Sequence, residues 1–188
     1  NFKNDELDNK KINLIDIKTS FRGNFKNDYI ENSFDVAFRL IKKGITNKLI
    51  NGPIEKTEFL KKKFLGVTEY ISEKFKVSKI AMLIYNEKLS VCPITTHLPL
   101  KLVSKKISQR LIIDKVTLID KFFRVNIGFK PKIAVTGLNP HCESILKFNE
   151  DEKIVYSAIK TKIKKGINVK GPYPADTIFL KQNRKKFN

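Results

Sequence analysis

Apolar residues recur at helical spacing in several parts of the chain. In residues 31–44, "ENSFDVAFRLIKKG", they fall on one face of a predicted helix that ends at Gly44. From residue 107 to about 126 the apolar positions again repeat every three or four residues, which predicts a helix facing the core; they are Ile112, Val116, Ile119 and Phe123. Shorter helices are predicted near 55–63, 68–75 and 150–165, with Thr68 as an N-cap.

Short apolar runs bounded by Gly, Pro or Asn predict strands between these helices. We expect strands at 12–17, within 47–53, at 132–136 and at 167–169. Residues 78–94 carry two apolar runs around Tyr85-Asn86-Glu87-Lys88, which predict a β-hairpin or two adjacent strands. The alternation of strands and helices predicts an α/β fold with a largely parallel sheet covered on both faces.

Charge is the most unusual feature of the composition. The net charge is +19, but of the 38 basic residues 33 are Lys and only 5 are Arg. Base readout and bidentate phosphate binding favour Arg, so we expect no dedicated nucleic-acid partner. The positive field instead favours a small anionic substrate.

Two features that the sequence lacks, a membrane-spanning stretch and a set of cysteines sufficient for a disulfide framework, predict the cellular location of the protein. No apolar stretch approaches the roughly 20 residues that a membrane-spanning helix needs, so no membrane partner is expected. The two cysteines are too few for a disulfide framework and are expected to be reduced thiols. We therefore expect a cytoplasmic protein.

The two histidines of the chain both follow apolar runs and lie near prolines. His97 lies in "VCPITTHLPL" and His141 in "KIAVTGLNPHCES". Ligands of α/β proteins gather at the carboxyl ends of strands, and two imidazoles there can bind zinc, cobalt or nickel. A catalytic metal site normally needs three protein ligands, so the spacing alone also allows two ordinary polar loop residues. From their matched placement at two strand ends we expect His97 and His141 to lie within reach of one metal ion, either in one subunit or across a dimer interface.

Three other side chains leave alternatives open. Cys142 has a sulfur beside His141, although adjacent residues in a turn usually point apart. Asp176, in "GPYPADT", either caps a following helix or serves a site. Lys56 is one of 33 lysines, so composition alone indicates no functional role for it. No phosphate-binding glycine loop and no Ser-His-Asp arrangement is evident.

Five ordered segments resemble one enzyme family. They are "INGPIEK", "GVTEY", "TTHLPL", "GLNPH" and "KGPYPADTIF", and from Phe21 to Phe179 the chain is similar to the 4-hydroxythreonine-4-phosphate dehydrogenase family. The resemblance implies an incomplete isocitrate/isopropylmalate dehydrogenase-like α/β/α fold, truncated at both ends. Residues 1–188 would then be a single partial α/β unit of a two-domain enzyme that works as a homodimer with active sites at the subunit interface.

The resemblance also implies a reaction and a site. The family oxidises 4-phosphooxy-L-threonine with NAD and decarboxylates the product, in pyridoxal 5′-phosphate biosynthesis, using a divalent metal such as zinc, magnesium or cobalt. His97 and His141 match two of three metal-binding histidines. Thr68 matches a substrate-phosphate contact, and Lys56 and Asp176 are implied to be catalytic polar groups.

Two departures from the family pattern limit this expectation. Val67 stands where the family commonly has a phosphate-binding histidine. The third histidine and the nicotinamide-binding segment are expected beyond Asn188, so the chain by itself is expected to be inactive. Two alternatives stay open: a dehydrogenase of a related acid such as threonate 4-phosphate, and a non-catalytic basic remnant that binds polyanions.

Overall fold

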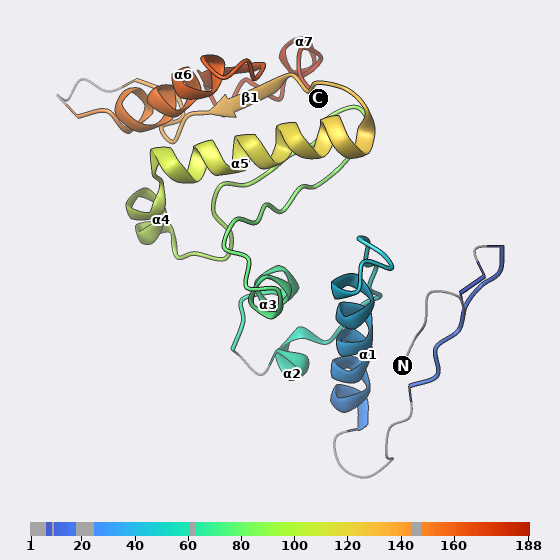
Figure 1. The fold of residues 1–188 in the computed structure, drawn as a ribbon. Helices are drawn as coiled ribbons and strands as arrows, with labels where there is room; N and C mark the ends of the chain where they lie inside the picture. The colour runs from blue at the N-terminus through green and yellow to red at the C-terminus, as the bar shows by residue number, and fades with distance from the viewer. Residues whose placement is uncertain (1–6, 9, 18–24, 61–62, 144–147) are drawn as a thin grey trace. The chain divides into compact units, whose positions relative to one another are not determined.

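The chain folds into two compact units in the computed structural model, Asn1–Tyr70 and Ile71–Asn188. The structure describes residues 7–8, 10–17, 25–60, 63–143 and 148–188 (Figure 1). Each unit has its own packed residues. The single partial unit expected across residues 1–188 stays a prediction.

Helices and aromatic side chains build the first unit. α1 (Phe25–Lys42) and α2 (Lys56–Phe59) lie within it, and α3 (Val67–Lys74) begins in it. The ring of Phe34 stacks on that of Phe59 with centroids 5.4 Å apart, and Tyr70 meets Phe59 edge-on at 5.1 Å. Such aromatic pairs contribute packing energy beyond the area that they bury, so this cluster joins the three helices.

The helix predicted at 31–44 is confirmed and begins earlier, at Phe25. It ends as expected, because Gly44 adopts a φ of +73° and donates its N–H to Ile41 O at 2.9 Å. The predicted N-cap at Thr68 is wrong. α3 already begins at Val67, so Thr68 lies within the first turn of the helix.

The strands predicted at 12–17 and within 47–53 are wrong, since neither segment is a strand in the structure. Ile12, Leu14 and Ile50 are 98%, 91% and 95% exposed. An apolar run becomes a strand only where a neighbouring strand takes up its backbone hydrogen bonds and a core covers one face. Within the described residues these two runs have neither.

A parallel pair of strands connected through a helix forms the centre of the second unit. β1 (Ile133–Thr136) and β2 (Val169–Tyr173) pair with Ile133 opposite Val169 and Ala134 opposite Lys170. The connection runs through the π-helical segment η3 (Asp151–Tyr156) and α6 (Ser157–Ile163). This arrangement confirms the α/β class, and the predicted strand at 132–136 is confirmed as β1.

The helix predicted between 107 and 126 is confirmed as α5 (Gln109–Phe122), which continues into the π-helical segment η2 (Phe123–Ile127). α5 and α6 pack against each other, and β1 and β2 join them in one apolar cluster. Its buried members are Ile112, Val116, Ile133, Val135, Val155, Ala158, Ile159, Ile167 and Val169. Burial alternates along β1, so Ile133 and Val135 face this core.

The predicted hairpin is reduced to one antiparallel bridge. Ile84 and Val91 exchange both backbone hydrogen bonds, at 2.8 and 3.0 Å. Two short helices complete the unit, α4 (Leu100–Lys106) and α7 (Lys181–Arg184). Among the helices that the structure describes, none combines the length and the apolar character that crossing a membrane requires.

Helix α5 depends on a side-chain cap at its start. Ser108 Oγ accepts a hydrogen bond from the N–H of Leu111 at 3.3 Å. We expect Ser108→Ala to lower the free energy of unfolding by about 1 kcal/mol, measured by urea denaturation. Ser104→Ala, at an exposed position inside α4, is the matched control and should change it by less than about 0.5 kcal/mol. Equal effects of the two substitutions would contradict the capping role.

Candidate functional site

The turn that follows β1 is held by a buried carboxylate. Asp151 is only 1% exposed, and its two oxygens accept the backbone N–H groups of Leu138 at 2.6 Å and Asn139 at 3.0 Å. Hydrogen bonds to an ionised acceptor are stronger than those between neutral groups. Asp151 therefore fixes the course of the chain just before His141.

Asp151 is itself positioned by the start of η3. The side-chain oxygen of Asn149 accepts the N–H of Asp151 at 2.9 Å and that of Glu152 at 3.4 Å. This is the arrangement of a helix cap, which satisfies amides that have no partner within the helix. The sequence analysis missed Asp151. The available signal was the Asn two residues before it in "FNEDEK", a pattern typical of a helix start.

Asn139 connects the remaining parts of the turn. Its Oδ1 accepts the N–H of His141 at 3.3 Å, its Nδ2 donates to Glu143 O at 2.9 Å, and its carbonyl accepts the N–H of Cys142 at 3.0 Å. The backbone of the turn is thus tied down while the His141 side chain is exposed. An exposed imidazole on an ordered backbone is placed where a ligand can reach it.

Gly137 is required where the turn begins. A Cβ there would lie 2.5 Å from Cys142 Sγ and 3.0 Å from Asp151 Oδ2. No larger residue fits without moving the thiol or the carboxylate. The glycine therefore permits the close packing of Cys142 and Asp151 against the end of β1.

The surroundings of the Cys142 thiol favour its protonated form. Burial raises the pKa of this thiol above its ordinary value, and the carboxylates of Asp151, Asp176 and Glu143 raise the pKa further, against a lowering by the Gly137 backbone. A metal ligand or a nucleophile must be a thiolate, so this environment disfavours Cys142 as the sulfur ligand considered from the sequence. The charge effect also associates Asp176 with the turn, although the two residues are 34 positions apart.

The environment of Cys142 predicts slow alkylation. A raised pKa lowers the thiolate fraction at every pH below it, so iodoacetamide should react with Cys142 more slowly than with free cysteine at neutral pH. Asp176→Asn should speed this reaction about twofold, because one pKa-raising charge is removed. The rate is followed by mass spectrometry as a function of pH in Cys92→Ser protein. Asp16→Asn is the matched control; an unchanged rate in Asp176→Asn would contradict the association of Asp176 with Cys142.

The expectation that Asp176 caps a following helix is wrong. The residues after β2 form a turn in which the N–H of Ile178 donates to Pro174 O at 3.1 Å, and α7 begins only at Lys181 with no side-chain cap. Buried Ile178 anchors the turn. Asp176 is exposed, so a role in the site stays a prediction for it.

His97 lies on irregular backbone between Val91 and α4, with an exposed side chain and a φ of +56°. Outside the masked segments, no group of three or more His, Cys, Asp or Glu residues is arranged to hold a metal. His97 and His141 are suitable donors by type, but two imidazoles fall short of a complete catalytic set. Their meeting at one ion stays a prediction.

The other two predicted residues belong to the first unit. Lys56 is the first residue of α2 and is exposed, and Thr68 is half-buried in the first turn of α3. The start of a helix is in general suited to an anion, because its first amides point outward along the helix axis. That Lys56 and Thr68 come together with His97, His141 and Asp176 in one site stays a prediction.

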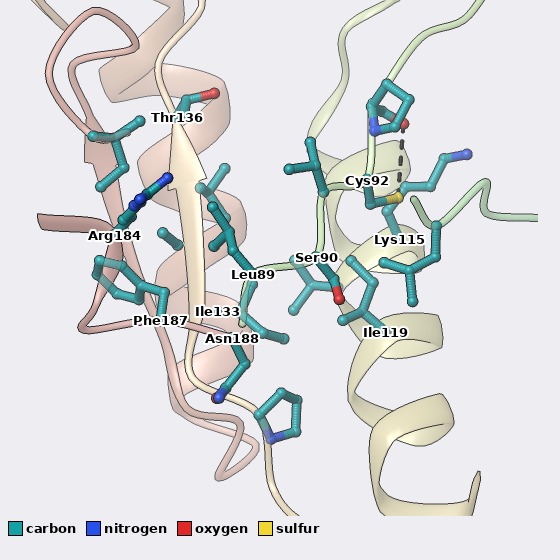
Figure 2. Close-up of a pocket in the computed structure, with 18 of the residues that line it drawn as sticks. Leu89, Ser90, Cys92, Lys115, Ile119, Ile133, Thr136, Arg184, Phe187 and Asn188 are labelled. Carbon is teal, nitrogen blue, oxygen red and sulfur yellow. Dashed lines mark hydrogen bonds between the residues drawn. The ribbon is translucent and has the colours of Figure 1, made fainter. Parts of the chain in front are cut away.

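A cavity of about 260 Å³ lies elsewhere in the second unit, between β1 and residues 89–94 (Figure 2). Its wall is mainly apolar and includes Cys92, Lys115 and Arg184. Lys115 Nζ donates to Ile80 O at 2.9 Å, and burial raises the pKa of Cys92 despite the nearby Lys115. None of the five predicted site residues lines this cavity, so it is separate from the predicted site.

Comparison with known proteins gives consistent results. The sequence model described as "Pyridoxal phosphate biosynthetic protein PdxA" matches residues 3–188. A 4-hydroxythreonine-4-phosphate dehydrogenase of Sulfurihydrogenibium sp. (strain YO3AOP1) is 38% identical over 178 residues, which cover 89% of this chain and 54% of the relative. One from Neisseria meningitidis (strain Z2491) is 35% identical over 162 residues, covering 80% and 48%.

Solved structures show the same likeness. The crystal structure of 4-hydroxythreonine-4-phosphate dehydrogenase from Klebsiella pneumoniae superposes with a TM-score of 0.73 at 30% identity, covering 86% of this chain and 50% of that one. A putative enzyme of the same name from Salmonella typhimurium gives a TM-score of 0.73 at 29% identity. The chain spans about half the length of the curated relatives that it matches.

Proposed function

This chain belongs to the PdxA family of pyridoxal phosphate biosynthetic proteins, and from that membership we propose that it serves the NAD-dependent oxidation and decarboxylation of 4-phosphooxy-L-threonine. The relatives that it matches are named 4-hydroxythreonine-4-phosphate dehydrogenases. The observation that carries the proposal is the turn after β1, where Asp151 holds the backbone and His141 is exposed.

The chain's own residues supply positioning in this proposal. Asp151 and Asn139 hold the backbone beside His141 through hydrogen bonds, so the segment that carries the imidazole is ordered before a ligand binds. Asp176 contributes negative charge near the same turn. Thr68 and the first amides of α3 bind the substrate phosphate, and Lys56 adds a positive charge.

A divalent metal such as zinc, magnesium or cobalt would be held by His97 and His141 together with a third ligand. When bound, such an ion supplies Lewis-acid polarisation of substrate oxygens. Exposed imidazoles suit this role by type.

The finer fold and the assembly are also part of the proposal. The α/β class and the likeness to the Klebsiella pneumoniae structure support an isocitrate/isopropylmalate dehydrogenase-like fold. We propose that the active protein is a cytoplasmic homodimer whose partner subunit helps to complete the site.

The test is a chimera in which this chain replaces the matched half of the Klebsiella pneumoniae relative. With NAD, a divalent metal and 4-phosphooxy-L-threonine, reduced nicotinamide should form faster than with threonate 4-phosphate. His97→Ala and His141→Ala should each lower kcat/KM at least about a hundredfold. A folded chimera that is inactive, that prefers threonate 4-phosphate, or that is indifferent to both substitutions would overturn the proposal.

Because residue 67 is a valine, we expect the substrate phosphate to bind weakly. We expect Val67→His in the same chimera to lower KM for the phosphorylated substrate about ten- to a hundredfold, because a charge-assisted hydrogen bond contributes roughly 1.5–3 kcal/mol. Val67→Phe provides a ring without a donor and should leave KM near its original value. Equal KM values in all three proteins would mean that other donors already satisfy the phosphate.

A further inference from the structure

Lys162 is the one buried lysine among the residues that the structure describes, and it is 5% exposed. Within those residues its Nζ has no hydrogen-bond acceptor and no carboxylate at ion-pair distance. The Nζ atom still touches solvent, because Tyr70 Oη is the only unpartnered side-chain nitrogen or oxygen of the described segments that is fully enclosed. Burying a charge without a partner costs free energy, so this ammonium is suited to a partner from solution.

Both carboxylates whose charges act on Lys162 are already paired with other cations. Asp114 Oδ1 lies 3.0 Å from Lys79 Nζ, and Asp114 Oδ2 lies 4.0 Å from Arg110 Nε. Asp120 Oδ2 lies 2.9 Å from the guanidinium of an arginine one turn further along the helix. Neither carboxylate is therefore left over to neutralise Lys162.

Positive charge is concentrated around the Lys162 ammonium. Burial lowers the pKa of Lys162 below its ordinary value, and the charge of Lys165 lowers it further. Lys79 also lowers this pKa, while Asp114 and Asp120 raise it. A bound anion would favour the ammonium form and so offset the cost of burying it.

The backbone that carries these cations is held together by side-chain contacts. α5 and α6 lie side by side (Figure 1), and Gln109 Nε2 at the start of α5 donates to Thr161 Oγ1 of α6 at 3.3 Å. Lys115 Nζ of α5 donates to Ile80 O at 2.9 Å, which fixes the segment that contains Lys79 beside α5. The cations are thus placed on one packed face before any ligand binds.

We propose that this cationic face, defined by Lys79, Arg110, Lys162 and Lys165, binds a small oxyanion of the phosphate class, with the Lys162 ammonium as the central contact. A phosphate group carries more than one negative charge at neutral pH and several acceptor oxygens, so it can bind more than one ammonium group. The ligand is either free phosphate or the phosphate group of an ester. None of the five predicted site residues belongs to this face, and the binding is independent of the proposed reaction.

The test titrates the 188-residue chain with inorganic phosphate while sodium chloride keeps the ionic strength constant. NMR follows the ¹³Cε signals of the lysines, and the Lys162 signal is identified by its absence from Lys162→Met protein. We expect a saturable shift of this signal. No shift, or the same shift with chloride alone, would overturn the proposal. Methyl phosphate is the second arm: tighter binding of methyl phosphate would assign the site to an ester, and tighter binding of inorganic phosphate to the free ion.

Matched variants separate a defined site from the general positive field. Lys162→Met keeps the apolar stem and removes the ammonium, so it should weaken phosphate binding at least about tenfold. Lys164→Met removes an exposed lysine from the same helix end and should weaken binding less than about twofold. Lys165→Met, with an intermediate effect, serves if circular dichroism shows that Lys162→Met is unfolded. Equal effects of all the substitutions would overturn the proposal.

Proton binding gives a readout that a purely structural role of Lys162 would not move. Saturating phosphate should raise the pKa of Lys162, because the anion binds the ammonium form. The affinity for phosphate should accordingly fall as the pH rises through this pKa. The measurement is the pH dependence of the Lys162 ¹³Cε shift with and without phosphate. An unchanged pKa at saturating phosphate would overturn the direct contact.

Discussion

Asp151→Ala is expected to lower the free energy of unfolding by about 2–4 kcal/mol, because it leaves two part-buried amides without their acceptor. The side chain is 1% exposed and accepts from Leu138 and Asn139 at 2.6 and 3.0 Å. Water cannot replace a buried acceptor without opening the turn. The measurement is urea denaturation followed by circular dichroism.

The role of Asp151 is separated from that of charge alone by two further substitutions. Asp151→Asn keeps one acceptor oxygen but places an NH₂ group against the second amide, so it should lose about half as much stability. Glu152→Ala removes a neighbouring exposed carboxylate and should change stability by less than about 0.5 kcal/mol. If Asp151→Ala resembles Glu152→Ala, the carboxylate does not hold the turn.

Gly171→Ala is expected to destabilise the protein by at least about 3 kcal/mol, from backbone strain and overlap together. Gly171 has a φ of +137°, a conformation that residues with a Cβ rarely adopt. The added Cβ would overlap the carbonyl oxygen of Val135 and approach Ile159 Cδ1 at 3.2 Å. Both neighbours belong to the core around β1, so neither yields easily.

Gly166 offers a matched control for this substitution. It has a positive φ of +74°, but nothing lies within 4 Å of the position of its Cβ. Gly166→Ala should therefore cost only about 1–2 kcal/mol, the strain of the left-handed backbone alone. The comparison uses the same urea denaturation. Equal losses for Gly166→Ala and Gly171→Ala would show that contact with Val135 contributes nothing.

The site was predictable from sequence only in part. Motif resemblance pointed to His141, and the structure places that residue in a turn with an exposed side chain. The same reasoning missed Asp151, whose hydrogen bonds join positions 12 and 13 residues apart. It also left Asp176 as a possible helix cap, whereas the structure places this residue in a turn after β2, before α7 begins at Lys181. Such contacts depend on how β1, β2 and η3 pack, which local patterns do not contain.

Local patterns were sufficient for the long helices and the α/β class. α1 and α5 were predictable because a helix satisfies its own backbone hydrogen bonds. The spacing of apolar residues that marks its buried face also repeats within a few turns of the sequence. Gly44 likewise marked the end of α1 through its own backbone freedom. Strands are different, because a strand needs a partner that is distant in sequence. β1 has β2 as that partner, whereas the equally apolar run at 12–17 has none among the described residues and forms no strand.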